Sequence, residues 1–276
     1  MSDSRAPLGV ALTGHRLPLE ARVRLAARAE ALGFELLMLD GDAPASLAAE
    51  HLRVYDPTAV MTAAALATRR IRLASIHLAH LWQPALLARQ LATLHELSGG
   101  RLVSHFGVGT KRAGAAERIA RLDQTLGELR PLLARARAET PIAVSAAGPR
   151  ALEVVRRHAD VWDANVPPLP ERLAPLRAQL GRALPTWIWV FARPGAPLES
   201  ALADYRRHAP WFRELAPDAQ ARAVLHGDPA RCRARLAELR RELDVALPIV
   251  DLAGLDEPAA ARALEALAKA SDPGIS

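Results

Sequence analysis

A short run of small residues, Ser145-Ala146-Ala147-Gly148-Pro149-Arg150, has the composition of a phosphate-binding turn. It follows the apolar segment 141–145 and opens an amphipathic helical pattern that extends to about residue 158. Small side chains let the backbone approach an anion closely. The free N–H groups of a first helical turn, together with the Arg150 guanidinium, can then bind that anion. The alternative is an ordinary Gly-Pro helix start that needs no ligand.

Two histidines, His77 and His105, lie near the ends of segments that read as strands. Imidazole titrates near neutral pH, so each is a candidate acid/base that faces a substrate. Asp40 and Asp42 end another such segment and are candidates to orient an imidazole or to act alone. For each histidine the alternative is a hydrogen-bonded structural role.

The other histidines have no metal-like spacing with carboxylates, so we expect no metal site. The single cysteine, Cys232, excludes an internal disulfide and any multi-cysteine site. Because Cys232 shares a helical stripe with leucines, we expect it to be a small buried hydrophobe. The tryptophans Trp187 and Trp189 alternate with aliphatic residues, so both must lie on one face of a strand, where core packing is the expectation.

These residues lie within an alternating series of short apolar segments and amphipathic helices. The segments predicted as strands are 8–12, 34–39, 71–78, 101–108, 141–145, 161–166, 186–191 and 247–252. Helical spacing is clearest at Ile119, Leu122, Leu126, Leu129 and Leu133, and 198–211 and 218–225 also read as helical. Eight strands alternating with helices in 276 residues indicate a (β/α)8 TIM-like barrel, with 1–276 as one domain and the first and last strands as neighbours. A doubly wound sheet is the alternative.

The charge and hydropathy patterns narrow the function classes. The net charge is +6, but all 36 basic residues except Lys111 and Lys269 are arginines spread along helices, and aromatic residues are scarce. This pattern is compositional bias, so we expect no nucleic-acid partner. No apolar run approaches the roughly 20 residues that span a bilayer. The N-terminal stretch lacks the pattern of a signal peptide, so we expect a cytoplasmic protein without a membrane partner.

Four ordered segments together resemble the bacterial luciferase-like family of flavin- and deazaflavin-dependent oxidoreductases. The most specific is DPTAVMTAAALATRRIRLASIHLAHLWQPALLARQLATLHELSGGRLVSHFGVG, residues 56–109. The others are RAEALGFELLMLDGD at 28–42, PIAVSAAGPRALEVVRRHADVW at 141–162 and GDPARCRARLAELRRELDVALPIVDL at 227–252. The resemblance is weakest over 183–226.

The resemblance implies an oxidoreductase, a monooxygenase or a reductase/dehydrogenase, that acts on a small organic substrate. Its cofactor would be reduced FMN or, alternatively, the deazaflavin coenzyme F420, bound at the carboxyl ends of the barrel strands. The cofactor carries the reactivity, and the protein supplies orientation, dryness and proton donors. A separate flavin reductase and assembly into a homo-oligomer are further implications.

The resemblance also gives expected cofactor contacts. The phosphate would lie against Ser145, Ala146, Ala147, Gly148 and Arg150. Gly107, Gly109 and Thr110, at the end of a strand, would let a ring or a phosphate tail approach the backbone. Ser75 and Ile76 fall where such enzymes carry a non-prolyl cis peptide beneath the isoalloxazine ring. Trp162 would line the pocket wall. Because His77 directly follows that peptide, we rank it before His105 as the proton donor.

Two features depart from the family pattern. Where relatives have an Asp-His or Glu-His pair after strand two, this chain has Asp40-Gly41-Asp42. The segment after Gly109 is also short. Two alternatives therefore stay open: a cofactor-poor binding or structural barrel, and a lyase or isomerase that uses the turn at 145–150 only to hold a substrate phosphate.

Overall fold

The computed structural model describes residues 7–13, 17–39, 41–42, 55–109, 114–208 and 210–268. Their strands are β1 (Gly9–Leu12), β2 (Leu36–Leu39), β3 (Arg72–Leu78), β4 (Leu102–Gly107), β5 (Ile142–Ser145), β6 (Val161–Asp163), β7 (Thr186–Pro194), β8 (Val224–Gly227) and β9 (Leu247–Asp251). Their α-helices are α1 (Leu19–Ala31), α2 (Pro57–Ala67), α3 (Pro84–Leu97), α4 (Ala115–Arg135), α5 (Pro149–His158), α6 (Pro170–Leu180), α7 (Leu198–His208), α8 (Pro217–Arg222), α9 (Pro229–Glu242) and α10 (Glu257–Ala268). Two 3-10 helices, η2 (Ala79–Leu81) and η3 (Pro210–Glu214), complete the described elements.

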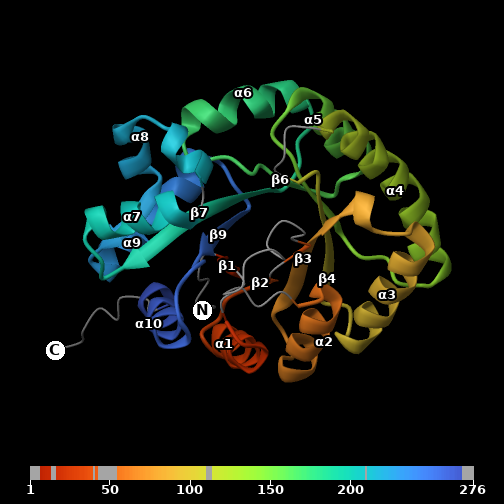
Figure 1. Cartoon of the computed structure of the whole chain (residues 1–276), viewed down its shortest axis with the longest axis horizontal. Helices are drawn as coiled ribbons and strands as arrows, with labels where there is room; N and C mark the ends of the chain where they lie inside the picture. The colour runs from red at the N-terminus through yellow and green to blue at the C-terminus, as the bar shows by residue number, and fades with distance from the viewer. Residues whose placement is uncertain are drawn as a thin grey trace, which may run out of the picture.

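Parallel strands close into a barrel, as the sequence predicts. In the described ranges the order around the barrel is β1-β2-β3-β4-β5-β6-β7-β9, eight strands in all, and β9 pairs with β1. Gly9 pairs with Leu36 on one side and with Ile249 on the other. The strands occupy the centre of Figure 1, and the helices surround them. The expected contact between the first and last predicted strands is therefore confirmed.

The helices start where the sequence places proline and aspartate. Asp56 caps α2 by accepting from the Ala59 N–H over 2.8 Å, and Pro57 is the first helical residue. Asp228 caps α9 in the same way, through the Arg231 N–H at 3.0 Å. Proline suits this position because the first N–H groups of a helix have no partner within it.

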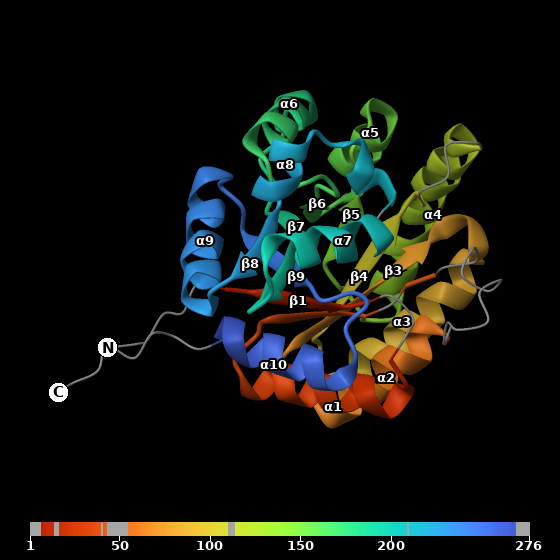
Figure 2. The same ribbon diagram turned by 60° about the vertical axis from the view of Figure 1, so that its left-hand side comes forward.

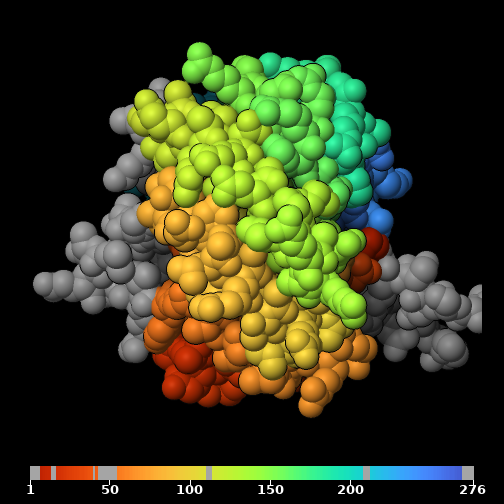
Figure 3. All heavy atoms as spheres, turned by 90° about the vertical axis from the view of Figure 1, so that its right-hand side faces the viewer, coloured from red at the N-terminus to blue at the C-terminus, as the bar shows by residue number. Residues whose placement is uncertain are grey.

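Neighbouring helices cover the outside of the barrel. The first and last helices, α1 and α10, lie side by side in Figure 2 and are joined by the Arg24–Glu257 ion pair at 2.6 Å. On another side, α2, α3, α4 and α5 form a continuous outer surface (Figure 3). None of the described helices has the length and apolar character that crossing a bilayer would require.

Alternate residues of each strand face the barrel interior or the layer beneath the helices. Ala11, Met38, Ala74 and Val103 belong to the interior cluster. Leu12, Leu37 and Leu39 belong to the larger cluster under the helices, to which Cys232 contributes as a buried residue, as expected. The core therefore has two layers. Because side chains alternate between the two faces of a strand, the position of a residue along its strand decides which layer it joins.

The structure corrects the sequence prediction between β7 and α9. Residues 218–225 are predicted as a helix, but α8 ends at Arg222 and Val224–Gly227 form β8. This strand pairs only with the end of β7, from Phe191 to Pro194, and so lies outside the closed barrel. The segment between β7 and β8 builds a separate hydrophobic cluster around Tyr205 and Phe212.

Candidate functional site

The carboxyl ends of β3 and β4 set the geometry of the candidate site. Ile76 of β3 pairs with His105 of β4, and His77 pairs with Phe106. Paired residues of parallel strands share a face of the sheet. Ile76 packs with the interior cluster, whereas Phe106 belongs to the layer under the helices. The two candidate histidines therefore point to opposite faces.

His105 belongs to a buried polar group inside the barrel, which we call the inner group: His105, Asp163 and Trp189. The Trp189 indole N–H donates to Asp163 Oδ2 over 3.1 Å. His105 Nε2 lies 3.1 Å from the same oxygen, off the line of a direct hydrogen bond. The side chains of His105 and Asp163 are 0% and 1% exposed, so this contact is shielded from solvent.

Small residues on β5 let this contact form across one intervening strand. His105 is on β4 and Asp163 on β6, and β5 separates them. The β5 residue paired with His105 is Ala143, and the one paired with Asp163 is Ser145. Neither side chain is long enough to fill the space over β5, so the imidazole and the carboxylate meet there. The other ring nitrogen, Nδ1, contacts Met38 Sδ at 3.4 Å.

His77 belongs to a second group of the same three residue types, which we call the outer group: Asp42, His77 and Trp82. The Trp82 indole N–H and the Leu78 N–H both donate to Asp42 Oδ2, at 2.5 and 2.8 Å. His77 Nδ1 lies 3.9 Å from that oxygen, and neither ring nitrogen has a hydrogen-bond partner among the described residues. Burial lowers the pKa of His77 to about 4, although the charge of Asp42 opposes the change.

This location changes the ranking of the two histidines. The sequence favours His77 as the proton donor, but its ring packs against Trp82 and Phe106 in the layer under the helices. A side chain in that layer points away from the strand ends where a barrel holds its ligand. His105 is the candidate histidine that faces the interior.

The end of β2 is bound tightly to the end of β3. The Asp42 N–H donates to the Ile76 carbonyl over 2.9 Å. A Cβ atom added to Gly41 would lie 2.2 Å from the same carbonyl oxygen, so no larger residue fits there without movement. A histidine, which the family pattern has after strand two, would therefore not fit at position 41 of this backbone. Asp40, the third catalytic candidate, lies outside the described residues.

Ser75 and Ile76 differ from the expected geometry. Every peptide bond in the described ranges is trans, so the expected cis bond at this position is not found. Ser75 is fully buried and pairs with Leu39, which faces the helix layer. Ile76 faces the interior and is partly exposed. Ile76 alone of the two is placed to contact a ligand at the carboxyl end of the barrel.

The turn at 145–150 has the arrangement that phosphate binding requires. Ser145 ends β5, and Pro149 begins α5 directly after Gly148. No described side chain caps this helix, and no described atom lies within 4 Å of a Cβ added to Gly148. Ala147 is partly exposed and Arg150 exposed. The first N–H groups of α5 therefore have no capping side chain among the described residues, and they lie beside an arginine.

Trp162 supports this turn from beneath. It is fully buried in the helix layer and does not line a pocket wall as expected. Its indole N–H donates to the Ala146 carbonyl at 2.9 Å, and the Ala146 N–H donates to the Asp163 carbonyl at 3.0 Å. Trp162 and β6 thus fix Ala146 on both sides, immediately before the open part of the turn.

The glycines after β4 have different surroundings. A Cβ added to Gly107 would lie 3.0 Å from the Ile76 side chain, so glycine keeps the space beside Ile76 open. Gly109 has a φ of +83°, which favours glycine, and it is exposed. Thr110 lies outside the described residues. Both described glycines are placed as expected at the carboxyl end of the barrel.

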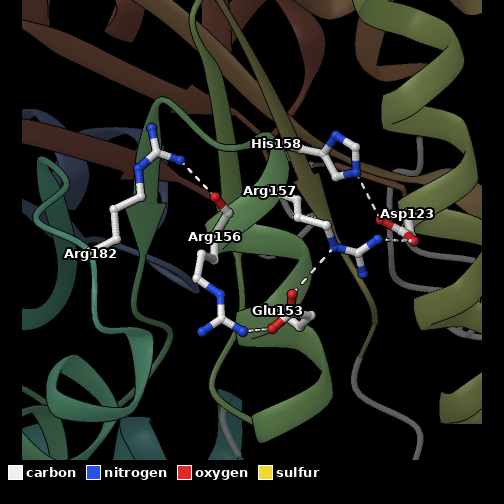
Figure 4. A network of polar contacts seen from close by, with 6 residues as sticks. All are labelled: Asp123, Glu153, Arg156, Arg157, His158 and Arg182. Carbon is white, nitrogen blue, oxygen red and sulfur yellow. Dashed lines mark hydrogen bonds and ion pairs between the residues drawn. The ribbon is translucent and has the colours of Figure 1, made fainter.

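The far end of α5 is held by a network of charged residues (Figure 4). Asp123 of α4 accepts from Arg157 at 2.7 Å and contacts His158 Nε2 at 2.8 Å. Glu153 pairs with Arg156, whose carbonyl accepts from Arg182 at 2.8 Å. The network ties the carboxyl end of α5 to α4 and leaves the amino end, with the open turn, outside it.

Sequence reasoning did not single out Asp163 or Trp189 as site residues. The signal for Asp163 was its place in β6, two residues after Val161 and next to Trp162. Because strand side chains alternate, Asp163 must lie on the face opposite to that of the Trp162 indole. Trp189 does share a face with Trp187, as the sequence predicts. Its indole N–H was a further signal, because a partly buried indole usually has a hydrogen-bond acceptor nearby.

A groove of about 610 Å³ lies at the other end of the barrel, beside Thr186 and Arg240. It contains none of the expected site residues.

Comparison with known protein families decides the classification. The family described as luciferase-like monooxygenase matches residues 5–180. The chain belongs to this family. No curated protein matches the sequence. The fold comparison agrees, because solved structures of similar architecture cover almost the whole chain.

Three solved structures illustrate this likeness. The F420-dependent tetrahydromethanopterin reductase of Methanopyrus kandleri has a TM-score of 0.73 at 15% identity, covering 96% of this chain and 98% of that one. The EDTA monooxygenase of Chelativorans sp. BNC1 has a TM-score of 0.74 at 15% identity, covering 96% and 92%. The oxygenating constituent of 3,6-diketocamphane monooxygenase from Pseudomonas putida, in complex with FMN, has a TM-score of 0.69 at 14% identity, covering 96% and 97%. At these identities the likeness establishes the fold.

Proposed function

We propose that this luciferase-like protein is an oxidoreductase that uses reduced FMN or the deazaflavin F420 on a small organic substrate. Family membership supports the reaction class. Structures of similar fold include an F420-dependent reductase and an FMN complex, which supports both cofactors. The single observation that carries the proposal is the amino end of α5, which no described side chain caps. No described atom lies within 4 Å of a Cβ added at Gly148, and Arg150 is in the first turn.

The residues of this turn fit a phosphate-bearing cofactor. Gly148 and Ala147 would bring the backbone close to the phosphate, and the first N–H groups of α5 would donate to it. Arg150 would add a charge-assisted hydrogen bond. Trp162 would keep the turn in place through the Ala146 carbonyl. When bound, the cofactor would supply the hydride or electron transfer, and the chain would supply its position.

The interior of the barrel would exclude water beneath the cofactor. Ile76 and Gly107 are adjacent at the carboxyl end, and the inner group lies below them. Because His105 is fully buried, it does not contact a ligand directly in this conformation. It would act on the site through Asp163, whereas the outward-facing His77 would not contribute.

Anaerobic titration with the two reduced cofactors tests the proposal. We expect one of them to bind, and Arg150→Ala to weaken that binding by about 1.5–3 kcal/mol, the range for a hydrogen bond to a charged group. Arg156→Ala is the matched control, since Arg156 is an exposed arginine at the other end of the same helix, in the charged network. It should leave the affinity unchanged.

Two outcomes would contradict the proposal. Equal affinities of wild type and Arg150→Ala for both cofactors would remove the turn from the site. Failure of the folded protein to bind either reduced cofactor would favour a binding or structural barrel that has lost the redox role.

A further inference from the structure

Trp189 differs from its neighbour Trp187 in a way that concerns the site. Both face the barrel interior from β7, but Trp187 is 2% exposed, whereas Trp189 is partly exposed. Trp189 is two residues nearer the carboxyl end of the strand, so its exposed part opens toward that end. Ile76 is also partly exposed there, whereas Phe191 packs against Tyr205 and Phe212 of the segment between β7 and β8. Trp189 and Ile76 therefore offer an aromatic and an apolar surface where the barrel would receive its substrate.

The orientation of the Trp189 indole is fixed from below. Its N–H donates to Asp163 Oδ2, an oxygen that also lies 3.1 Å from His105 Nε2. Trp162, the residue before Asp163, is buried in the layer under the helices, and its indole N–H donates to the Ala146 carbonyl. These contacts restrict the β6 backbone and with it the position of the Asp163 carboxylate. His105 is in turn confined by Met38 and by an edge-on contact with Trp187 at 5.9 Å between ring centroids.

We propose that Trp189 is the stacking surface for a planar, uncharged, aromatic or conjugated substrate, and that Asp163 and His105 are positioning residues for its indole. Aromatic rings prefer offset-stacked or edge-to-face geometries, so a ring held at a defined angle favours one way of stacking. A buried carboxylate that accepts from the indole N–H supplies that angle, and the imidazole restrains the carboxylate. The inference rests on the proposed function and names its substrate class.

The test uses menadione, a planar two-ring quinone without a phosphate, and the indole N–H resonances of the folded protein. In wild type we expect menadione to bind and to shift the Trp189 resonance while leaving that of Trp82 in place. Trp82 is the internal control because its indole also donates to an aspartate, but in the outer group.

The variants separate stacking from positioning. Asp163→Asn should move the Trp189 resonance without ligand and weaken menadione binding about threefold to tenfold, the scale of one aromatic contact. Trp189→Phe keeps a ring but loses the donor, so it should weaken binding similarly and make a further Asp163→Asn change silent. His105→Gln should have a smaller effect of the same sign, and His77→Gln none.

Several results would overturn the proposal. These are a menadione affinity that is unchanged in both Asp163→Asn and Trp189→Phe, a ligand shift at Trp82 in place of Trp189, or no binding of menadione to wild type. If Asp163→Asn does not fold, Trp189→Phe and His105→Gln decide the question. Cofactor titration is independent, so a protein that binds FMN but not menadione refutes this inference and keeps the proposed function.

Discussion

The inner and outer groups contain the same three residue types, and their histidines lie on opposite faces of the paired strands β3 and β4. In each, a tryptophan indole donates to an aspartate Oδ2 that faces a histidine nitrogen. The histidine lies 3.1 Å from this oxygen in the inner group and 3.9 Å in the outer group. A backbone N–H also donates to each carboxylate, from Leu78 to Asp42 and from Asn165 to Asp163. The Leu78 bond joins two different strand ends, so Asp42 holds the segment after β2 against β3.

This difference shows that position relative to the sheet decides the role of such a group. The outer group lies between the strands and the helices, where Asp42 holds the segment after β2 against β3. The inner group faces the carboxyl end of the barrel through Trp189. Residue type and spacing make both histidines candidates, and only the face of the sheet on which each side chain lies separates them.

Removing each aspartate should give the largest contrast. Asp163→Ala removes the acceptor of the Trp189 and Asn165 N–H groups and the carboxylate beside the buried His105 ring, so we expect a loss of about 3–5 kcal/mol in the free energy of unfolding. Asp42→Ala should cost less, about 1–3 kcal/mol, because the Asp42 side chain is 9% exposed and water can reach part of the site. Urea denaturation of both variants measures this. Equal losses would mean that the two groups are energetically equivalent.

Acid should destabilise the protein through the outer group. The pKa of His77 is about 4 in the folded protein and 6.5 in the unfolded chain. Between these pH values the unfolded chain therefore binds more protons than the folded protein. The contribution of neutral His77 to the free energy of unfolding is therefore fully present above pH 6.5. It is lost as the pH falls toward 4, by up to about 3 kcal/mol at roughly 1.4 kcal/mol per pH unit. His77→Phe should flatten this part of the stability profile. A profile identical to that of wild type would assign the acid sensitivity to other groups.

Adding one methyl group at two glycines should distinguish a closed region from an open one. Gly41→Ala would place its Cβ 2.2 Å from the Ile76 carbonyl oxygen, so we expect a loss of about 1–3 kcal/mol and a shifted Trp82 indole resonance. Gly148→Ala meets no described atom within 4 Å, and its φ of −114° suits alanine. Its stability should stay within about 0.5 kcal/mol of wild type. Thermal denaturation of the two variants makes the comparison, and a large loss at Gly148 would show that the turn is not open.

The smallest effect is expected in the charged network on α5. Asp123→Ala removes the contacts with Arg157 and His158, but the Asp123 side chain is 29% exposed, so the loss should be about 0.5–1 kcal/mol. It should shrink further in high salt, because exposed ion pairs are screened. A loss as large as that of Asp163→Ala would contradict this, because it would mean that the surface network stabilises the protein as much as the inner group does.

The barrel could be predicted from the sequence because each strand and helix carries its own local signal. The order of apolar segments, the prolines at helix starts and the stripe of α4 are all present in the chain, and the eight predicted strands form the closed sheet. The strand β8 could not be predicted in this way. It directly follows α8, and the alanine-rich residues around it favour helix.

The roles of the candidate residues depended on information that the sequence does not carry. In β3, Leu73, Ala74 and Ile76 are all apolar, so alternation gives no sign of which face is inward, as is usual for strands buried on both faces. His77 ranks first from the sequence because it directly follows the expected cis-peptide position, and no pattern in β3 shows that its side chain faces the helices. The contact of His105 with Asp163 required two residues far apart in the chain and the small Ala143 between their strands. No local pattern encodes such a contact.

The most direct test of the account is a crystal structure of the protein with its reduced cofactor, grown without oxygen. We expect the phosphate to lie against Ala147 and Gly148 at the amino end of α5, within reach of Arg150, and the ring to lie at the carboxyl end of the barrel above the inner group. A phosphate bound elsewhere, for example in the groove beside Arg240 at the opposite end of the barrel, would contradict the account.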